Sequence, residues 1–211
     1  MFDFQTNVKK TEYGIVIDDF YRSPEKVREL LLTLDPTAHK HDATPSYNGR
    51  YFKDMRHTLH SHHVTPIYKF LSQWSRQPPL GKDGERRIST NVFRMKKSPF
   101  HTPDTHYWWP HFDQGYTAIL YLNEEDDTGT NLYRTNKKEE EAKFATEEHY
   151  EPWRPKDEYE LIHTFEPKFN RLIMFNARKH CHGMNLCSDL FSTGLPRMNQ
   201  VFFYDGRNQN P

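Results

Sequence analysis

Apolar positions in the first 75 residues predict one short strand followed by two helices. Residues 13–17 (YGIVI) form a short apolar run that ends at Asp18 and is typical of a strand. Ser23, Pro24 and Glu25 supply an N-cap, a proline for the first helical position and an early acid. The apolar residues behind them recur at helical spacing: Val27, Leu30, Leu31 and Leu34. A second helix is expected to begin at Thr65 and Pro66, with one apolar face made of Ile67, Phe70, Leu71 and Trp74.

From residue 88 onward the pattern changes from helical spacing to strands. The apolar runs are rich in β-branched and aromatic residues and are bounded by turn residues: Ile88–Met95, Tyr116–Leu122, Leu161–Phe165, Leu172–Phe175 and Val201–Tyr204. We therefore expect a β-rich α+β fold, in which two N-terminal helices cover a mostly antiparallel body.

A polar stretch, Asn136–Pro155, interrupts the strand series. It contains Glu139, Glu140 and Glu141 and is too charged to be a core element. We expect a solvated helical insertion or a mobile lid near a substrate entrance. The chain has no internal repeat, and residues 1–211 are expected to form one domain.

Composition narrows the class of protein. The chain has 211 residues, and its 15 Phe, 12 Tyr and 4 Trp are too many for a disordered segment. Lys+Arg and Asp+Glu balance at 29 each, which removes any general electrostatic reason to bind nucleic acid or an anionic membrane. No apolar run approaches the length of a membrane span, and the N-terminus lacks the apolar stretch of a signal peptide. Two cysteines, Cys181 and Cys187, make no disulfide framework. The expectation is a cytoplasmic protein with neither a membrane nor a nucleic-acid partner.

Candidate chemistry is concentrated in the segment His111-Phe112-Asp113. On an extended chain the imidazole and the carboxylate lie on one face, and Phe112 lies on the other. A histidine downstream, His180 or His182, can complete a set of two histidines and one carboxylate. Such a set occupies one face of an octahedral ion and suits non-haem Fe(II). In a chain with 13 histidines the alternative is an ordinary surface ion pair between His111 and Asp113.

An arginine follows at the start of the last apolar strand. Arg197 begins the stretch RMNQVFFY, 15 residues beyond His182. It is poorly placed for a core residue, and its planar guanidinium can hold a carboxylate by two parallel N–H bonds.

The order of these motifs resembles the 2-oxoglutarate/Fe(II)-dependent dioxygenase superfamily, and more closely its prolyl-hydroxylase-like branch. The stretches that carry the resemblance are HFD, AILYLNEEDDTGTNLY, FNRLIMFNARKHCHG and RMNQVFFY, within residues 13–204. The resemblance implies a double-stranded β-helix (jelly-roll) core that holds Fe(II).

Carried over residue by residue, the resemblance assigns His111, Asp113 and His182 as metal ligands and Arg197 as the partner of the C5 carboxylate of 2-oxoglutarate. His182 is preferred to His180 because Gly183 follows it and its interval to Arg197 is shorter. Asn91 and Tyr121 are the further candidates for contacts with 2-oxoglutarate, and a packing role is the alternative for both.

The chemistry implied by this resemblance couples O2 and the decarboxylation of 2-oxoglutarate to succinate and CO2 with oxidation of a substrate C–H bond. Members that halogenate lack the carboxylate ligand, so Asp113 favours hydroxylation or a related oxidation. The substrate is expected to be a small molecule or a protein side chain.

Two other classes of function remain open at this point. The same His-Asp-His set can bind Zn2+ and activate water in a metal-dependent hydrolase or cupin-like enzyme, and Arg197 argues against that class. The other class is a jelly-roll binding module without catalysis. A second histidine cluster, formed by His57, His60, His62 and His63, lacks an acid or cysteine at ligand spacing and predicts a surface cluster. Tyr107, Trp108 and Trp109 predict either a substrate entrance or aromatic packing at its rim.

Overall fold

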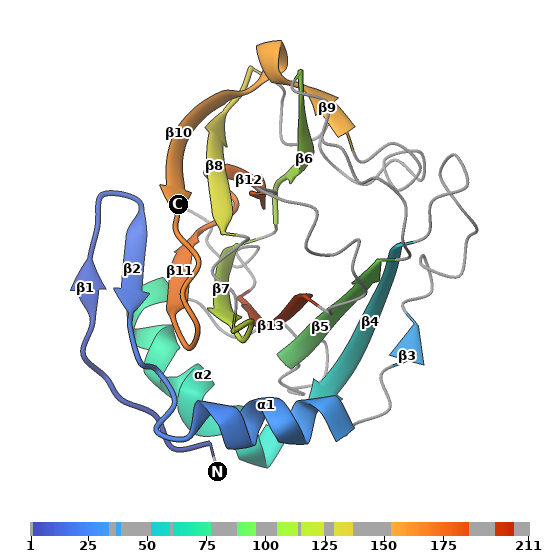
Figure 1. Ribbon diagram of the computed structural model, residues 1–211. Coiled ribbons are helices and arrows are strands. Elements are labelled where there is room, and N and C mark those ends of the chain that lie inside the picture. The colour runs from blue at the N-terminus through green and yellow to red at the C-terminus, as the bar shows by residue number, and fades with distance from the viewer. Residues whose placement is uncertain are drawn as a thin grey trace.

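A computed structural model of the chain describes ten segments: residues 2–33, 37–38, 52–59, 61–76, 88–95, 105–113, 115–124, 129–136, 153–185 and 197–204. Within them, only the backbone is described for residues 37–38, 52–59, 61–63, 88–95, 153 and 197. These segments form two β-sheets and two α-helices (Figure 1).

The larger sheet has eight strands, and every pair of neighbours in it is antiparallel. In pairing order its strands are β1 (Lys9–Lys10), β2 (Gly14–Ile17), β11 (Leu172–Asn176), β7 (Tyr116–Tyr121), β13 (Arg197–Phe203), β5 (Ile88–Met95), β4 (Phe52–Leu59) and β3 (Thr37–Ala38). Strands far apart in the sequence are therefore neighbours, and the C-terminal β13 lies between β7 and β5.

The smaller sheet has five strands, which are also antiparallel. In pairing order they are β10 (Glu160–Phe165), β8 (Thr130–Arg134), β12 (Cys181–Met184), β6 (His106–His111) and β9 (Trp153–Pro155). A short 3-10 helix, Lys156–Glu158, precedes β10.

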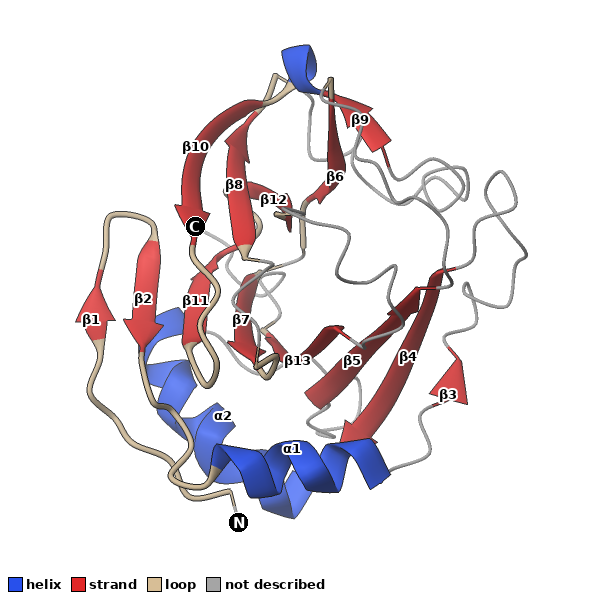
Figure 2. Ribbon diagram, in the orientation of Figure 1, coloured by secondary structure: helices blue, strands red, loops and turns tan. Residues whose placement is uncertain are grey.

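Alternation along β7 shows how the layers are built. Ala118 and Leu120 pack toward the helices, in a core that also contains Val27 of α1 and Ile67 of α2. Ile119 and Tyr121 point to the opposite face, in a core shared with the smaller sheet. Because successive strand residues face opposite sides, a strand buried on both faces is largely apolar, as YTAILY is apart from Thr117. The helices lie together below the larger sheet in Figure 2, and the smaller sheet lies above it.

The two helices confirm the prediction that N-terminal helices cover the sheet. Helix α1 spans Pro24–Thr33, and Val27 and Leu31 are its buried residues. Helix α2 spans Ser61–Ser75, so it begins four residues before the predicted start at Thr65. Pro66 lies inside the helix near its beginning, where the lost N–H removes only one hydrogen bond. Neither helix is long and apolar enough to cross a membrane.

The coarse fold class is also confirmed, because the described chain is β-rich with two antiparallel sheets and few helices. The six apolar runs correspond to β2, β5, β7, β10, β11 and β13, and β13 begins at Arg197, the first residue of the stretch RMNQVFFY. The remaining strands were not predicted: β1, β3, β4, β6, β8, β9 and β12. Of the proposed insertion at 136–155, residues 137–152 lie outside the described segments, and Trp153–Pro155 forms β9.

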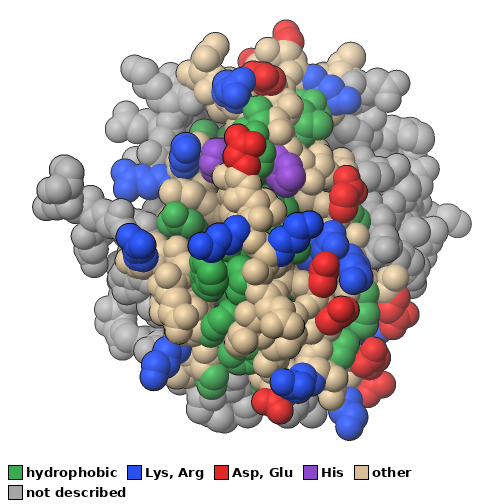
Figure 3. Space-filling view, turned by 90° about the vertical axis from the view of Figure 1, so that its left-hand side faces the viewer, with side chains coloured by type: hydrophobic (Ala, Val, Ile, Leu, Met, Phe, Trp, Pro, Cys, Tyr) green, Lys and Arg blue, Asp and Glu red, His purple; other side chains and the backbone are tan. Residues whose placement is uncertain are grey.

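The face on the β1, β2 and β10 side carries charges of both signs (Figure 3). Arg134 and Glu160 form an ion pair of 2.6 Å there, and Arg171 and Asp18 form another of 2.6 Å. The Arg134–Glu160 pair is exposed and contributes at most about 1 kcal/mol, whereas Arg171 is half-buried and donates two hydrogen bonds to Asp18. Since the signs alternate, this face has no field of a single sign.

Asn170 ties the segment before α1 to the larger sheet. Its side chain accepts from the Tyr21 N–H at 2.8 Å and donates to the Tyr21 carbonyl at 2.8 Å. Its own N–H donates to the Tyr121 carbonyl at 2.9 Å, and its φ is 63°. Asparagine tolerates this left-handed conformation better than most residues do. One buried residue therefore fixes the approach to α1 through its side chain and the end of β7 through its backbone N–H.

We expect Asn170→Ala to lower the free energy of unfolding by about 2–5 kcal/mol, because it leaves two buried backbone groups of Tyr21 unpaired and places a Cβ at positive φ. Asn170→Gly should recover about 1 kcal/mol of that loss, since glycine removes only the conformational strain. Urea denaturation of the three proteins measures both effects. A glycine variant as stable as the wild type would show that the side-chain hydrogen bonds contribute nothing.

Candidate metal centre

Strand pairing brings two histidines together at the middle of the smaller sheet. His182 is the second residue of β12, and its register partner on β6 is His111, the last residue of that strand. Directly opposed residues of antiparallel strands project to the same face. Their ring centroids accordingly lie 4.3 Å apart.

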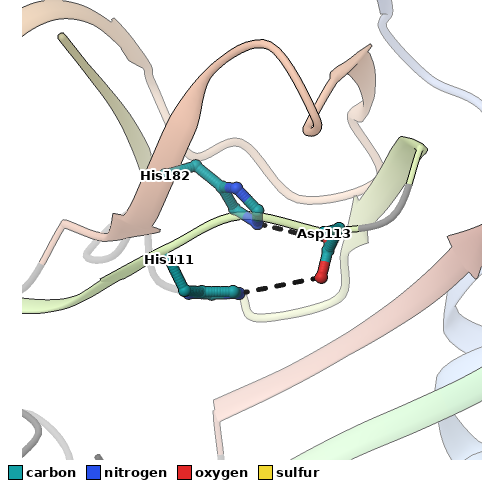
Figure 4. Close-up of side chains that lie close together, drawn as sticks. All are labelled: His111, Asp113 and His182. Carbon is teal, nitrogen blue, oxygen red and sulfur yellow. Dashed lines mark ion pairs between the residues drawn. The ribbon is translucent and has the colours of Figure 1, made fainter. Parts of the chain in front are cut away.

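Asp113 completes this group two residues beyond His111. His111 Nε2 lies 4.0 Å from Asp113 Oδ1, and His182 Nε2 lies 3.5 Å from Asp113 Oδ2 (Figure 4). Phe112 points the other way and packs against a cluster of Tyr133, Tyr159 and Cys181. The extended HxD segment therefore has its imidazole and carboxylate on one face, as the spacing indicates.

The three ligand atoms of His111, Asp113 and His182 all lie within 4.8 Å of one another. Among the described residues this is the one group of three or more His, Cys, Asp or Glu side chains close enough to hold a metal ion. The group is largely shielded from solvent, and His182 is only 4% exposed. Two imidazoles and one carboxylate on one side of an ion leave its other positions open to small ligands.

Two neighbouring elements fix the position of Asp113, one through its backbone and one through its carboxylate. The Asp113 N–H donates to the Ala177 carbonyl at 3.1 Å, which ties it to the turn after β11. The Thr117 hydroxyl, at the start of β7, donates to Asp113 Oδ2. Burial alone raises the pKa of the Asp113 carboxyl, but His182, His111 and Thr117 together hold that pKa well below its usual range. The carboxylate is therefore ionised at neutral pH, which is the form that binds cations.

The His111 ring is oriented by its own strand. Its Nδ1 lies 2.8 Å from the Trp109 carbonyl, which can only accept a hydrogen bond. The proton is therefore on Nδ1, and Nε2 carries the lone pair on the side facing Asp113.

The His182 ring is fixed by packing instead. It contacts the edge of Phe175 at a centroid distance of 4.9 Å, and its buried Nδ1 has no hydrogen-bond partner in the described part of the chain.

His180, the alternative distal histidine, lies outside the group. It precedes β12 and packs against Tyr13 of the β1–β2 hairpin at a centroid distance of 5.7 Å. Burial, followed by the charge of Lys179, lowers the pKa of its imidazole. The two histidines are two apart in sequence but do not share a site.

The candidate residues for 2-oxoglutarate lie on three adjacent strands of the larger sheet. Asn91 on β5 is the register partner of Asn199 on β13, and Asn199 is in turn the partner of Tyr121 on β7. Arg197 is the first residue of β13, two positions before Asn199, and its register partner is Phe93. Only the backbone of Asn91 and Arg197 is described. The Tyr121 hydroxyl donates to Thr130 Oγ1 at 2.7 Å and so crosses from one sheet to the other.

Three residues, one at the metal group and two beside the candidate cosubstrate residues, were missed by sequence reasoning. Besides Thr117, Asn123 accepts from the Met198 N–H and thereby fixes the start of β13 next to Arg197. Asn199 Oδ1 is buried without a hydrogen-bond partner among the described residues, next to Tyr121. For two of them the sequence held a local signal: Thr117 lies at the start of the apolar run Tyr116–Leu122, and Asn123 directly follows its end.

The second histidine cluster is divided between different elements. His57 belongs to β4 and His62 and His63 to α2, while His60 lies outside the described segments. Cys187 also lies outside them, and Cys181 is buried beside Tyr133. Trp108 is buried at 4% exposure, whereas Trp109 is half-buried, so the aromatic segment lies partly in the core.

Two solved structures to which this chain is similar carry informative names. One is a prolyl-4-hydroxylase of Pseudomonas putida, with 13% identity and a TM-score of 0.43 over 85% of this chain and 81% of the other. The second is an N-substituted L-amino acid dioxygenase of Burkholderia ambifaria, with 12% identity and a TM-score of 0.48 over 96% and 92%. One name is that of a hydroxylase and the other that of a dioxygenase. TM-scores below 0.5 describe a distant likeness, and the chemistry of this chain depends on its own side chains.

A family model and a sequence search complete the comparison. No curated protein matches the sequence. The family model covers residues 3–188, which is most of the chain. The chain therefore belongs to the family of unknown function DUF6445.

Proposed function

We propose that this protein is a 2-oxoglutarate- and Fe(II)-dependent oxygenase that hydroxylates its substrate. The observation that carries the proposal is the group of His111, Asp113 and His182, whose ligand atoms lie within 4.8 Å of one another on one side of a largely buried site. A facial set of two histidines and one carboxylate with open positions is typical of non-haem Fe(II) oxygenases.

The residues fit a divalent iron ion. Imidazole nitrogens and a carboxylate suit Fe(II), and the low pKa of Asp113 keeps its carboxylate charged. His111 presents the Nε2 lone pair because its Nδ1 proton is held by the Trp109 carbonyl. When bound, iron and 2-oxoglutarate supply the oxidising chemistry, in which O2 is consumed and succinate and CO2 are released. The protein residues position both and exclude water.

The larger sheet supports a site for the cosubstrate. Residues directly opposite each other in a sheet share a face, so the row Asn91, Asn199 and Tyr121 is expected to present three polar groups together. Residues two apart on a strand also share a face, so Arg197 is expected beside Asn199. Asn199 Oδ1 is buried and has no hydrogen-bond partner among the described residues, which supports a polar ligand at this position beside Tyr121. Arg197 would hold the C5 carboxylate of 2-oxoglutarate by its guanidinium fork.

We extend the proposal to the fold, the domain organisation and the class of substrate. Two antiparallel sheets share an apolar core, and the candidate metal group lies on the smaller one, which supports a double-stranded β-helix. We propose that residues 1–211 form one domain and that the polar stretch 136–155 contributes a lid, of which residues 137–152 lie outside the described segments. The proposed substrate is a small molecule or a protein side chain.

The proposal is tested by anaerobic loading with Fe(II) and 2-oxoglutarate, followed by exposure to O2 and a panel of substrates, with succinate measured. His182→Ala should lose at least about 100-fold in Fe(II) affinity and form no succinate, since it removes a ligand. His180→Ala is the matched control and should bind Fe(II) within about threefold of wild type. Equal Fe(II) affinity in the two variants contradicts the ligand assignment. Zn2+ binding without any succinate formation by the wild type would favour the hydrolase class instead.

Arg197→Lys tests the cosubstrate site. Lysine keeps the charge but loses the bidentate fork, so the Kd for 2-oxoglutarate should rise by about tenfold or more. Fe(II) affinity should stay near the wild-type value, because the arginine is not a ligand, and succinate formation should recover at high 2-oxoglutarate. Calorimetric titration of the Fe(II)-loaded protein measures the change. The same Kd in Arg197→Lys, Arg197→Ala and wild type would contradict this assignment.

Thr117→Val tests the hydrogen bond to Asp113. Valine has a similar shape but cannot donate, so Fe(II) affinity should fall by about 10–100-fold, as for other groups that orient a ligand. Thr117→Ser retains the hydroxyl and should stay within about threefold of wild type. Serine and valine variants with the same affinity would show that the hydroxyl does not act on the site.

A further inference from the structure

Strand β6 contains one residue more than its partner β12 beside the metal group. His111 pairs with His182, and the next contact is between Trp108 and Met184. From one contact to the next the chain advances three residues on β6 but two on β12, which defines a β-bulge at Trp109 and Pro110. Bulges next to active sites change the direction of a side chain.

Trp109 has an uncommon backbone conformation, with a φ of 47°. Three other described non-glycine residues have a positive φ, and each has a local reason. Asp19 and Asn170 are of the types that tolerate this conformation, and Arg76 follows the last residue of α2, where such a residue often ends a helix. A tryptophan within a strand has no such reason, and strain of this kind costs about 1–3 kcal/mol.

The facing strand leaves room for the bulge because it has no side chain at Gly183. A Cβ at Gly183 would lie 2.5 Å from the Trp108 carbonyl oxygen and 3.2 Å from the Trp109 oxygen. Gly183 does not itself have a left-handed φ, so the glycine is required for space rather than for conformation. Pro110 has no N–H, so the bulge leaves no donor of that residue unpaired.

The bulge has a direct consequence for the metal group. The Trp109 carbonyl accepts a hydrogen bond from His111 Nδ1 at 2.8 Å, two residues along the same chain. This contact fixes both the rotation of the imidazole and the position of its proton. It turns Nε2 toward Asp113, whose Oδ1 lies 4.0 Å away.

We propose that the bulge at Trp109 and Pro110, together with Gly183, positions His111 for metal binding. Trp109 acts through its backbone carbonyl and Gly183 by the absence of a side chain, so both are positioning residues and neither is a ligand. The inference rests on the proposed metal site, and it adds that a strained backbone selects the tautomer of one ligand.

A pair of variants at Trp109 separates the backbone from the indole. Trp109→Asn and Trp109→Val both remove the ring, but asparagine adopts positive φ readily and the β-branched valine does not. We expect Trp109→Asn to bind Fe(II) within about threefold of wild type and Trp109→Val to bind about 10–100-fold more weakly. Equal affinities in the two variants would overturn the proposal.

Gly183→Ala has a matched control at Gly14. A Cβ at Gly14 would lie 2.0 Å from the Met174 carbonyl oxygen, a similar clash between β2 and β11 of the other sheet. Both alanine variants should be less stable to urea. Measured per folded protein, only Gly183→Ala should lose about 10–100-fold in Fe(II) affinity. Loss of affinity in both, or in neither, would overturn the proposal.

The tautomer of His111 can be read without any metal. Nitrogen-15 NMR of the metal-free protein, assigned against His111→Gln, should show the proton on Nδ1 in wild type and Trp109→Asn, and a mixture of tautomers in Trp109→Val. An Nδ1 proton in all three would overturn the proposal even if the wild type binds Fe(II). Conversely, the expected tautomers in a protein that binds no metal would sustain the positioning role and overturn only the proposed function.

Discussion

The candidate site depends on the register of β12 between β6 and β8. His182 is paired with His111 on one side and with Leu132 on the other, and Leu132 lies in the core between the sheets. Because side chains alternate along a strand, a slip of one residue would turn Cys181 and Gly183 inward and His182 outward. The apolar packing of Leu132 and Phe175 therefore stabilises the fold and also fixes which side chain of β12 faces Asp113.

Strand β7 links the two parts of the proposed active site. Its first residues supply the Thr117 hydroxyl to Asp113, and its end places Tyr121 beside Asn199. Thr117 and Tyr121 are four residues apart on one face of the strand, a separation of about 13–14 Å at the usual rise. Burial on both faces and pairing with β11 and β13 keep β7 rigid. A rigid strand can hold a ligand and a cosubstrate contact at a fixed distance, which a loop cannot do as well.

Sequence reasoning found the parts of the fold that are encoded locally. Doubly buried strands such as Leu172–Asn176 are continuous apolar runs, and α1 has both its start signal and its periodicity. Strand β6 was missed because HYWWPH contains a proline and a bulge, and β12 because CHGM is short and contains glycine. The HxD pattern identified His111 and Asp113, while the separation of His182 from His180 depends on pairing with distant strands. Pro66 misled the prediction of α2, since a proline near a helix start need not be its first residue.

Residues with an unfavourable backbone conformation or an unpaired buried atom are informative when the contacts that offset their cost are considered. Asn170, like Trp109, has a positive φ, but its side chain forms two hydrogen bonds to Tyr21 that offset the cost of this conformation. At Trp109 the strained residue contacts a candidate metal ligand instead, through its carbonyl, which accepts a hydrogen bond from His111. His182 Nδ1 is likewise buried without a partner among the described residues, close to the same group. Strain reduces stability wherever it occurs. At Trp109 it accompanies a hydrogen bond that orients a candidate metal ligand, so there it serves the geometry of the site rather than stability.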